Sequence, residues 1–197
     1  MYEQSKSAKR RYSDGAFQSR YFVGTGLDLG GGPDPLAQYK GVFRGLGDVV
    51  TYEYADGDAQ YLANVTDASF DFVHASHCLE HMRDPREALV NWARVVRPGG
   101  FLIVTVPDED LYEHGQWPSR FNSDHKWSFT IYKAASRMPR SINVVDLARE
   151  LAGVLELERL WLVRDFFREW MEPQLDQTMT PVAECAIEVV WRRRESG

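Results

Sequence analysis

LDLGGGPDP, residues 27–35, is the stretch of sequence that decides the fold. It contains the end of a short apolar segment, Thr25–Leu29, that we predict to be a buried strand, and three glycines follow directly. Glycine tolerates positive φ and lets a ligand approach bare backbone. Ligands of open α/β sheets bind at the carboxyl ends of the strands. The stretch therefore predicts a ligand-binding loop at the edge of an α/β sheet.

The spacing of this loop distinguishes two classes of ligand. A dinucleotide fingerprint has a third glycine three positions after Gly32, and this chain has Pro35 there, which disfavours a nicotinamide-dependent oxidoreductase. Asp28 lies just before the loop. Its carboxylate would repel a pyrophosphate but would attract an ammonium group such as that of a methionine moiety.

Strands and helices alternate on both sides of the loop. β-branched and aromatic residues favour strands, and a continuous apolar run such as Phe101–Val106 is typical of a strand buried on both faces of a parallel sheet. This alternation predicts a doubly wound α/β sheet in one domain over residues 1–197. The other predicted elements are strands at Val49–Tyr54, Phe70–Ala75, Leu155–Val163 and Ala186–Trp191, and helices at Leu36–Phe43 and Asn143–Leu155.

One further helix has clear signals at both ends. Asp84 suits the N-cap, Pro85 suits the first helical position, and Glu87 stands where a capping box needs it. Apolar residues then recur at helical spacing until the sequence Arg97–Gly100, RPGG, which predicts a turn.

Composition and charge disfavour several classes of partner. The formal net charge of the 197 residues is −6, whereas nucleic-acid binding needs surplus Lys and Arg. No apolar run reaches the roughly 18 residues of a membrane span. We therefore expect no nucleic-acid or membrane partner. We interpret the basic residues near both ends as solvated tails: Lys6, Lys9, Arg10, Arg11, Arg192, Arg193 and Arg194.

The two cysteines give little information about redox state. Cys78 and Cys185 are far apart and form no CxxC motif, so neither a disulfide nor a zinc site is indicated. Without such signals, a reducing, cytoplasmic compartment is the default expectation. For the oligomeric state, we expect a monomer or a homodimer.

A carboxylate at the end of the second strand is a candidate ribose ligand. Glu53 lies about twenty residues past the glycine loop, where an acidic side chain can accept hydrogen bonds from both ribose hydroxyls. Asp56 is the competing residue.

Four motifs in the right order resemble the class I S-adenosylmethionine-dependent methyltransferases, of methyltransferase type 11. They are DLGGG at 28–32, GDAQYL at 57–62, FDFVHASHCLEH at 70–81 and VRPGG at 96–100. The resemblance implies S-adenosylmethionine as cofactor and a Rossmann-like sheet of seven strands with an antiparallel last strand. It implies cofactor contacts from Asp28, Gly30, Gly31, Gly32, Glu53, Asp58, Ala59 and Ser76, with Asp58 and Ala59 at the adenine. Only Tyr54–Gly57 separates Glu53 from Asp58, where family members usually have a helix.

Methyl transfer to a heteroatom mainly requires alignment of the reacting groups, and a general base is optional. Two histidines are the candidate catalytic bases: His125, inside an aromatic segment after the strand Phe101–Val106, and His77, just after the strand Phe70–Ala75. We expect His74 to be a satisfied core group and His81 to be structural. Asp124 beside His125 does not make a ligand set, so we expect no metal.

The aromatic segment Pro107–Tyr132 has two interpretations. It could pack on the rest of the domain and serve stability alone. Alternatively, it could form a substrate lid in which Trp127 contacts the acceptor. Long loops at the ligand edge of a sheet are often functional, which favours the lid. We therefore predict lid or insert segments at 107–140 and 164–184, and an N-terminal extension at 1–24.

The predicted function is methyl transfer from S-adenosylmethionine to a small molecule or metabolite. One alternative is a non-catalytic S-adenosylmethionine-binding or interaction protein. The other is a nicotinamide-dependent oxidoreductase, which Pro35 and Asp28 disfavour.

Overall fold

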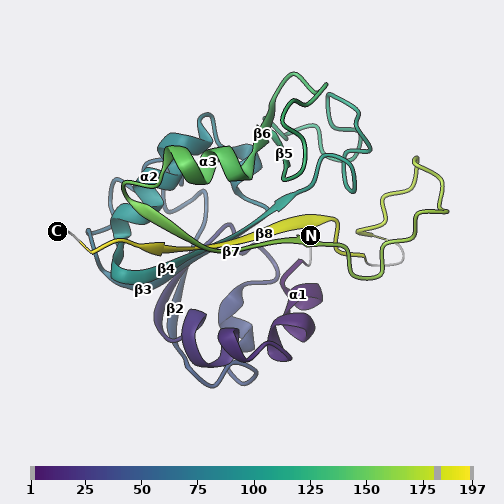
Figure 1. Cartoon of the computed structure of the whole chain (residues 1–197). Helices are drawn as coiled ribbons and strands as arrows, with labels where there is room; N and C mark the ends of the chain where they lie inside the picture. The colour runs from purple at the N-terminus through teal and green to yellow at the C-terminus, as the bar shows by residue number, and fades with distance from the viewer. Residues whose placement is uncertain (1–2, 180–182, 196–197) are drawn as a thin grey trace.

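A six-stranded mixed sheet forms the centre of the computed structural model, which describes residues 3–179 and 183–195 (Figure 1). Its strand order is β2-β1-β3-β4-β8-β7, and β5 and β6 form a separate pair. The strands are β1 Gly24–Leu29, β2 Leu46–Tyr52, β3 Phe70–Ser76, β4 Val96–Pro107, β5 Ser128–Thr130, β6 Ser141–Asn143, β7 Leu155–Val163 and β8 Ala186–Arg193. The α-helices are α1 Glu3–Tyr12, α2 Pro85–Val95 and α3 Val144–Glu150.

The strand pairing confirms the predicted doubly wound sheet. β1 lies parallel to β2 and β3, with Leu27 opposite Val50 and Val73, and β3 lies parallel to β4. β8, the last strand, is antiparallel to both β4 and β7. The carboxyl ends of β1, β2, β3 and β4 therefore meet at one edge of the sheet. The main sheet has one strand fewer than the expected seven in the described part of the chain, because residues 53–69 form turns.

Two apolar cores cover the two faces of the sheet, with α2 and α3 on one face and the N-terminal segment on the other (Figure 1). The side chains of α2 explain its position, since Leu89, Trp92 and Ala93 are fully buried in the larger core. Asp84 is its N-cap as predicted, and accepts hydrogen bonds from the backbone N–H groups of Arg86 and Glu87. The helix is thus fixed at its start by a cap and along its length by apolar burial.

The N-terminal basic cluster is part of the fold, so its interpretation as a solvated tail was wrong. The residues form α1, and the Arg10 guanidinium bonds the carboxylates of Glu184 and Glu188 at 2.9–3.1 Å. Arg11 is fully buried and donates to Glu188 at 2.8 Å. The sequence shows the cations, but their partners lie 174–178 positions away. Only the folded sheet brings them together.

The C-terminal basic residues were also wrongly interpreted as a tail. Arg192 and Arg193 belong to β8, and Arg193 donates to the carbonyl oxygen of Arg94, which secures the end of the sheet. Two predicted helices are shorter than expected: Leu36–Tyr39 is a single 3-10 helix, and α3 ends at Glu150. No helix in the described ranges is long and apolar enough to cross a membrane.

The segment after β4 forms a substructure beyond the carboxyl edge of the sheet (Figure 1). Its short strands β5 and β6 pair in parallel. Asp108, which follows β4 directly, forms an isolated parallel β-bridge with Phe129 of β5. This region corresponds to the predicted insert 107–140. The second predicted insert, 164–184, includes residues 180–182, which lie outside the described ranges.

Candidate functional site

The glycine loop after β1 exposes backbone at the ligand edge. Gly30 and Gly32 have φ of +69° and +53°, values that side-chain-bearing residues rarely adopt. A Cβ atom on Gly31 would lie 2.7 Å from Asp28 Oδ2 and 3.0 Å from Pro35. The loop therefore needs glycine for two separate reasons: conformation at Gly30 and Gly32, and space at Gly31.

Asp28 is buried and anchors the loop. Its Oδ2 accepts from the backbone N–H of Leu36 at 2.7 Å, and its Oδ1 lies 2.7 Å from His74 Nδ1. The Arg11 guanidinium lies 3.1 Å from His74 Nε2. Because a guanidinium can only donate, Nε2 must accept, and Nδ1 carries the proton that is donated to Asp28. His74 is thus the satisfied core residue that the sequence predicted.

The charge state of His74 agrees with this arrangement. Burial lowers the pKa of its imidazole, and the opposing effect of the hydrogen bond that His74 donates to Asp28 does not outweigh the burial. A neutral His74 leaves the negative charge of Asp28 available to the neighbouring space.

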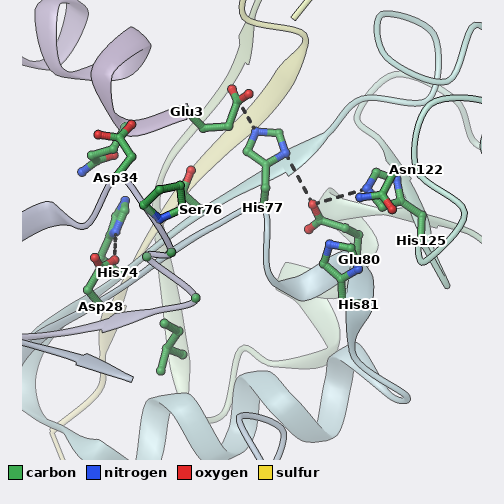
Figure 2. A pocket seen from close by; sticks show the side chains of 16 residues that line it. Glu3, Asp28, Asp34, His74, Ser76, His77, Glu80, His81, Asn122 and His125 are labelled. Atoms are coloured by element: carbon green, nitrogen blue, oxygen red, sulfur yellow. Dashed lines mark hydrogen bonds and ion pairs between the residues drawn. The ribbon is translucent and has the colours of Figure 1, made fainter. Parts of the chain in front are cut away.

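A hollow of about 140 Å³ opens beside the loop; we call it the small hollow. Figure 2 shows side chains from α1, the loop, β3 and the insert converging on it. Two residues of α1, Glu3 and Gln4, line it, which the sequence did not predict. Its other lining residues include Asp28, Gly30, Gly31, Gly32, Ser76, His77, Glu80, His81, Asn122 and His125.

A second hollow of about 810 Å³, the large hollow, lies on the other side of Gly30. Gly30 and His81 line both hollows, so the two adjoin at the loop. Three residues predicted to contact the cofactor, Glu53, Asp58 and Ala59, line the large hollow. The predicted cofactor residues are therefore divided between two adjoining spaces.

The contacts of the carboxylates near the large hollow differ in kind. Glu53 Oε1 accepts from the backbone N–H of Gly32 at 2.7 Å, whereas Asp56 Oδ2 accepts from the N–H of Glu53 at 2.8 Å. Asp56 thus closes the turn, while Glu53 reaches the loop and the hollow, which favours Glu53 as the ribose ligand. Asp58 is held by Arg83 Nη2 at 2.7 Å.

His77 and Glu80 form an ion pair at the small hollow. His77 has φ of +53°, and its Nδ1 lies 3.4 Å from Glu80 Oε1 while its Nε2 lies 3.6 Å from Glu3 Oε2 (Figure 2). Burial disfavours the charged form of His77, but Glu3 and Glu80 outweigh it and raise its pKa. Burial likewise opposes ionisation of Glu80, but the neighbouring histidines lower its pKa.

His125 reaches the same group of residues from the insert. Its Nδ1 lies 2.7 Å from Glu113 Oε1, and its Nε2 points toward Glu80 Oε1 at 3.9 Å (Figure 2). His81 pairs through Nδ1 with Asp124 Oδ2 at 2.9 Å. The structure thus brings both predicted base candidates, His77 and His125, to one hollow. Glu80 is the residue between them that the sequence did not single out, although it stands in the LEH part of the third motif.

Trp127 lies elsewhere. Its indole N–H donates to the carbonyl oxygens of Met82 and Arg83, and its ring packs against the larger core with the Arg140 guanidinium 5.9 Å away. It does not line the small or the large hollow in the described part of the chain. The structure therefore gives Trp127 packing contacts, and its contact with the acceptor stays a prediction.

Comparison with known proteins shows what the chain is similar to. Residues 13–104 match the methyltransferase domain family. This segment, somewhat less than half of the chain, is similar to class I methyltransferase domains. An O-methyltransferase of Pyrenophora dematioidea is 31% identical over 56% of this chain and 44% of its own length. The ubiquinone biosynthesis O-methyltransferase of Paracidovorax citrulli is 35% identical over 40% of this chain and 32% of its own length.

The fold of the chain as a whole has relatives among solved structures. One chain of a Haloferax volcanii complex that contains the Trm112 methyltransferase activator superposes with a TM-score of 0.59 and 15% identity, over 98% of this chain and 91% of that one. The chain spans less than half the length of the two curated relatives. The family match covers the loop, Glu53, Asp58, His77 and Glu80, but ends before the insert that carries His125.

Proposed function

We propose that the protein transfers a methyl group from S-adenosylmethionine to a small-molecule acceptor. The observation that supports this most is the pair of hollows meeting at Gly30 and His81. A bound cofactor could lie across the glycine loop with its adenosine in the large hollow and its methionine end at the small one. When bound, the cofactor supplies an electrophilic methyl group on a sulfonium sulfur.

The residues present fit such a ligand. The volume of the large hollow, about 810 Å³, falls within the roughly 300–1,000 Å³ of small-molecule sites. Within the described residues only one oxygen of the Glu53 carboxylate accepts a hydrogen bond, from the Gly32 N–H, so the other is placed to accept ribose hydroxyls. Asp28 contributes a buried negative charge for an ammonium group, and positive φ at Gly30 and Gly32 keeps the loop backbone accessible.

The small hollow suits the acceptor. His77 and His125 border it, and either imidazole, in its neutral form, could take a proton from an acceptor hydroxyl as the methyl group is transferred. A volume of about 140 Å³ next to the loop favours a small acceptor over a macromolecular one. Two relatives are named O-methyltransferases, so hydroxyl-bearing metabolites are the first class to test.

The decisive experiment has two stages. Thermal melting with S-adenosylhomocysteine at about 100 times its Kd should stabilise the protein by about 2.7 kcal/mol, while NAD should not change the melting temperature. Turnover of methyl-labelled S-adenosylmethionine with a panel of small hydroxyl compounds should then give labelled product. Binding without turnover on any acceptor would favour a non-catalytic binding protein, and stabilisation by NAD alone would favour an oxidoreductase.

A further inference from the structure

Glu80 is buried without the partners that a carboxylate requires. Its side chain has no exposed surface, and neither carboxylate oxygen accepts a hydrogen bond from the residues that the structure describes. An ionised carboxylate carries about four lone-pair sites, and leaving them unsatisfied away from water is costly. The groups nearest to it are imidazole nitrogens, namely His77 Nδ1 at 3.4 Å and His125 Nε2 at 3.9 Å. His77 balances part of this charge as an ion-pair partner, but the carboxylate still lacks hydrogen-bond donors, so a metal cation could bind between these side chains.

His81 and His125 present metal-binding nitrogens toward this charge. One donor atom each from Glu80, His81 and His125 lie within 4.8 Å of one another. First-row divalent metals bind such nitrogen and oxygen ligands at roughly 2.0–2.2 Å, so modest side-chain shifts would close the three around one ion. Glu80 and His81 are fixed by the 3-10 helix Leu79–His81, and His125 is supplied by the insert.

The outer contacts of both histidines match those of metal ligands. His125 Nδ1 pairs with the buried carboxylate of Glu113 at 2.7 Å, and His81 Nδ1 pairs with Asp124 at 2.9 Å. A histidine that donates Nδ1–H to a carboxylate keeps its lone pair on Nε2, which is the arrangement typical of metal-binding histidines. Both rings therefore have the tautomer that a metal site needs.

We propose that Glu80, His81 and His125 bind one divalent transition-metal ion, of the zinc class, at the floor of the small hollow. Two imidazoles and one carboxylate suit zinc and its neighbours, whereas Mg²⁺ and Ca²⁺ prefer oxygen ligands alone. Three protein ligands leave a coordination position open, as in catalytic zinc sites. From the sequence, only the neighbours Asp124 and His125 were considered as metal ligands. The proposed ligands come from separate segments of the chain, so no local sequence pattern indicates them.

The site would also define the substrate class of the proposed function. All three ligands line the small hollow, so the open position would face the place assigned to the acceptor. This part of the inference rests on the proposed methyl transfer. It favours acceptors whose oxygen can ligate a metal, such as hydroxyls next to a second oxygen. His125 then acts as a ligand, which leaves His77 as the candidate base.

The test measures metal binding without any adenosyl ligand. Untagged protein is stripped with chelator and titrated with Zn²⁺ against a chromophoric competitor, and with Co²⁺ by visible absorption. The wild type should bind one ion per chain and melt at a higher temperature when loaded. Glu80→Gln, His81→Gln and His125→Gln should each weaken Zn²⁺ binding at least about 100-fold, and Glu113→Gln should weaken it about 10- to 100-fold through the outer contact.

His114→Gln is the matched control. His114 belongs to the same insert, packs on Phe121 and is not among the residues that line the small hollow in the described part of the chain, so its variant should bind Zn²⁺ like the wild type. Far-UV circular dichroism of each apo variant should match that of the apo wild type, which guards against a variant that merely fails to fold. Absence of Zn²⁺ and Co²⁺ binding at micromolar concentrations, or equal affinity in His125→Gln and His114→Gln, would overturn the proposal.

The two proposals fail separately. Metal binding with the predicted variant pattern but no stabilisation by S-adenosylhomocysteine would retain the metal site and refute the proposed function. Stabilisation by S-adenosylhomocysteine without metal binding would refute the metal site and retain the proposed function.

Discussion

Glu188 on β8 should be among the most sensitive single positions for stability. It is fully buried, and burial would raise its pKa, but Arg11 and Arg10 lower it to about 2. An unfolded glutamate titrates near 4.3, so the shift of roughly two units corresponds to about 3 kcal/mol. Because the folded pKa is lowered, this stabilisation is present above about pH 4.3 and is lost as the pH falls toward 2.

Glu188→Gln keeps the volume but removes the charge that Arg10 and Arg11 share. Breaking a buried ion pair from one side costs about 3–5 kcal/mol, since the remaining charge stays buried and uncompensated. For a chain of this size that corresponds to a fall in melting temperature of about 6–20 °C. Urea unfolding at pH 7 and at intervals down to pH 2.5 measures both the loss and its pH dependence.

The control is an exposed pair with the same chemistry. Asp48 contacts Lys40 at 3.0 Å, and both side chains are more than half exposed, so Asp48→Asn should change stability by less than about 1 kcal/mol. Glu188→Gln should also weaken ligand binding, because Arg10 and Arg11 hold α1, which supplies Glu3 and Gln4 to the small hollow. A Glu188→Gln protein within 1 kcal/mol of the wild type at pH 7 would refute this reasoning.

The remaining predictions concern the cofactor residues and use calorimetric titration with S-adenosylhomocysteine. Asp28→Asn keeps the shape but loses a charge-assisted contact, so affinity should fall by about 1.5–3 kcal/mol; unchanged affinity would leave Asp28 as a loop anchor only. Glu53→Gln should weaken binding while Asp56→Asn should not, and the opposite pattern would assign the ribose to Asp56. Gly31→Ala should lower both affinity and melting temperature, because its Cβ would lie 2.7 Å from Asp28 Oδ2; a variant with wild-type values would show that the loop adapts freely.

Most of the fold could be predicted because its signals are local. The apolar run of β4, the glycines after β1 and the Asp84 cap of α2 each occupy a few consecutive residues, and each lies in the predicted element. The predicted turn at Arg97–Gly100 was wrong, because β4 already begins at Val96. The site divides differently. The glycine loop and Glu53 follow motifs with known spacing, so the sequence indicates them, and the structure places them at adjoining hollows.

What the sequence did not reveal depends on contacts between distant residues. Arg10 and Arg11 were interpreted as part of a solvated tail, because their partner Glu188 lies near the other end of the chain. Glu80 stands in a recognisable motif, but its importance arises from its burial beside His125, which no local pattern encodes. Trp127 is the opposite case. Its place in the sequence near His125 suggested a role in the site, but its ring packs against the larger core.

The most direct measurement of the central claim is a crystal structure with S-adenosylhomocysteine bound. We expect the ribose hydroxyls to contact Glu53, the adenine to lie in the large hollow beside Asp58 and Ala59, and the sulfur to lie near Gly30, where the two hollows meet. The methyl-bearing side of the sulfur should face the small hollow with His77. Adenosine bound away from Glu53, or a sulfur turned away from the small hollow, would contradict the proposed function.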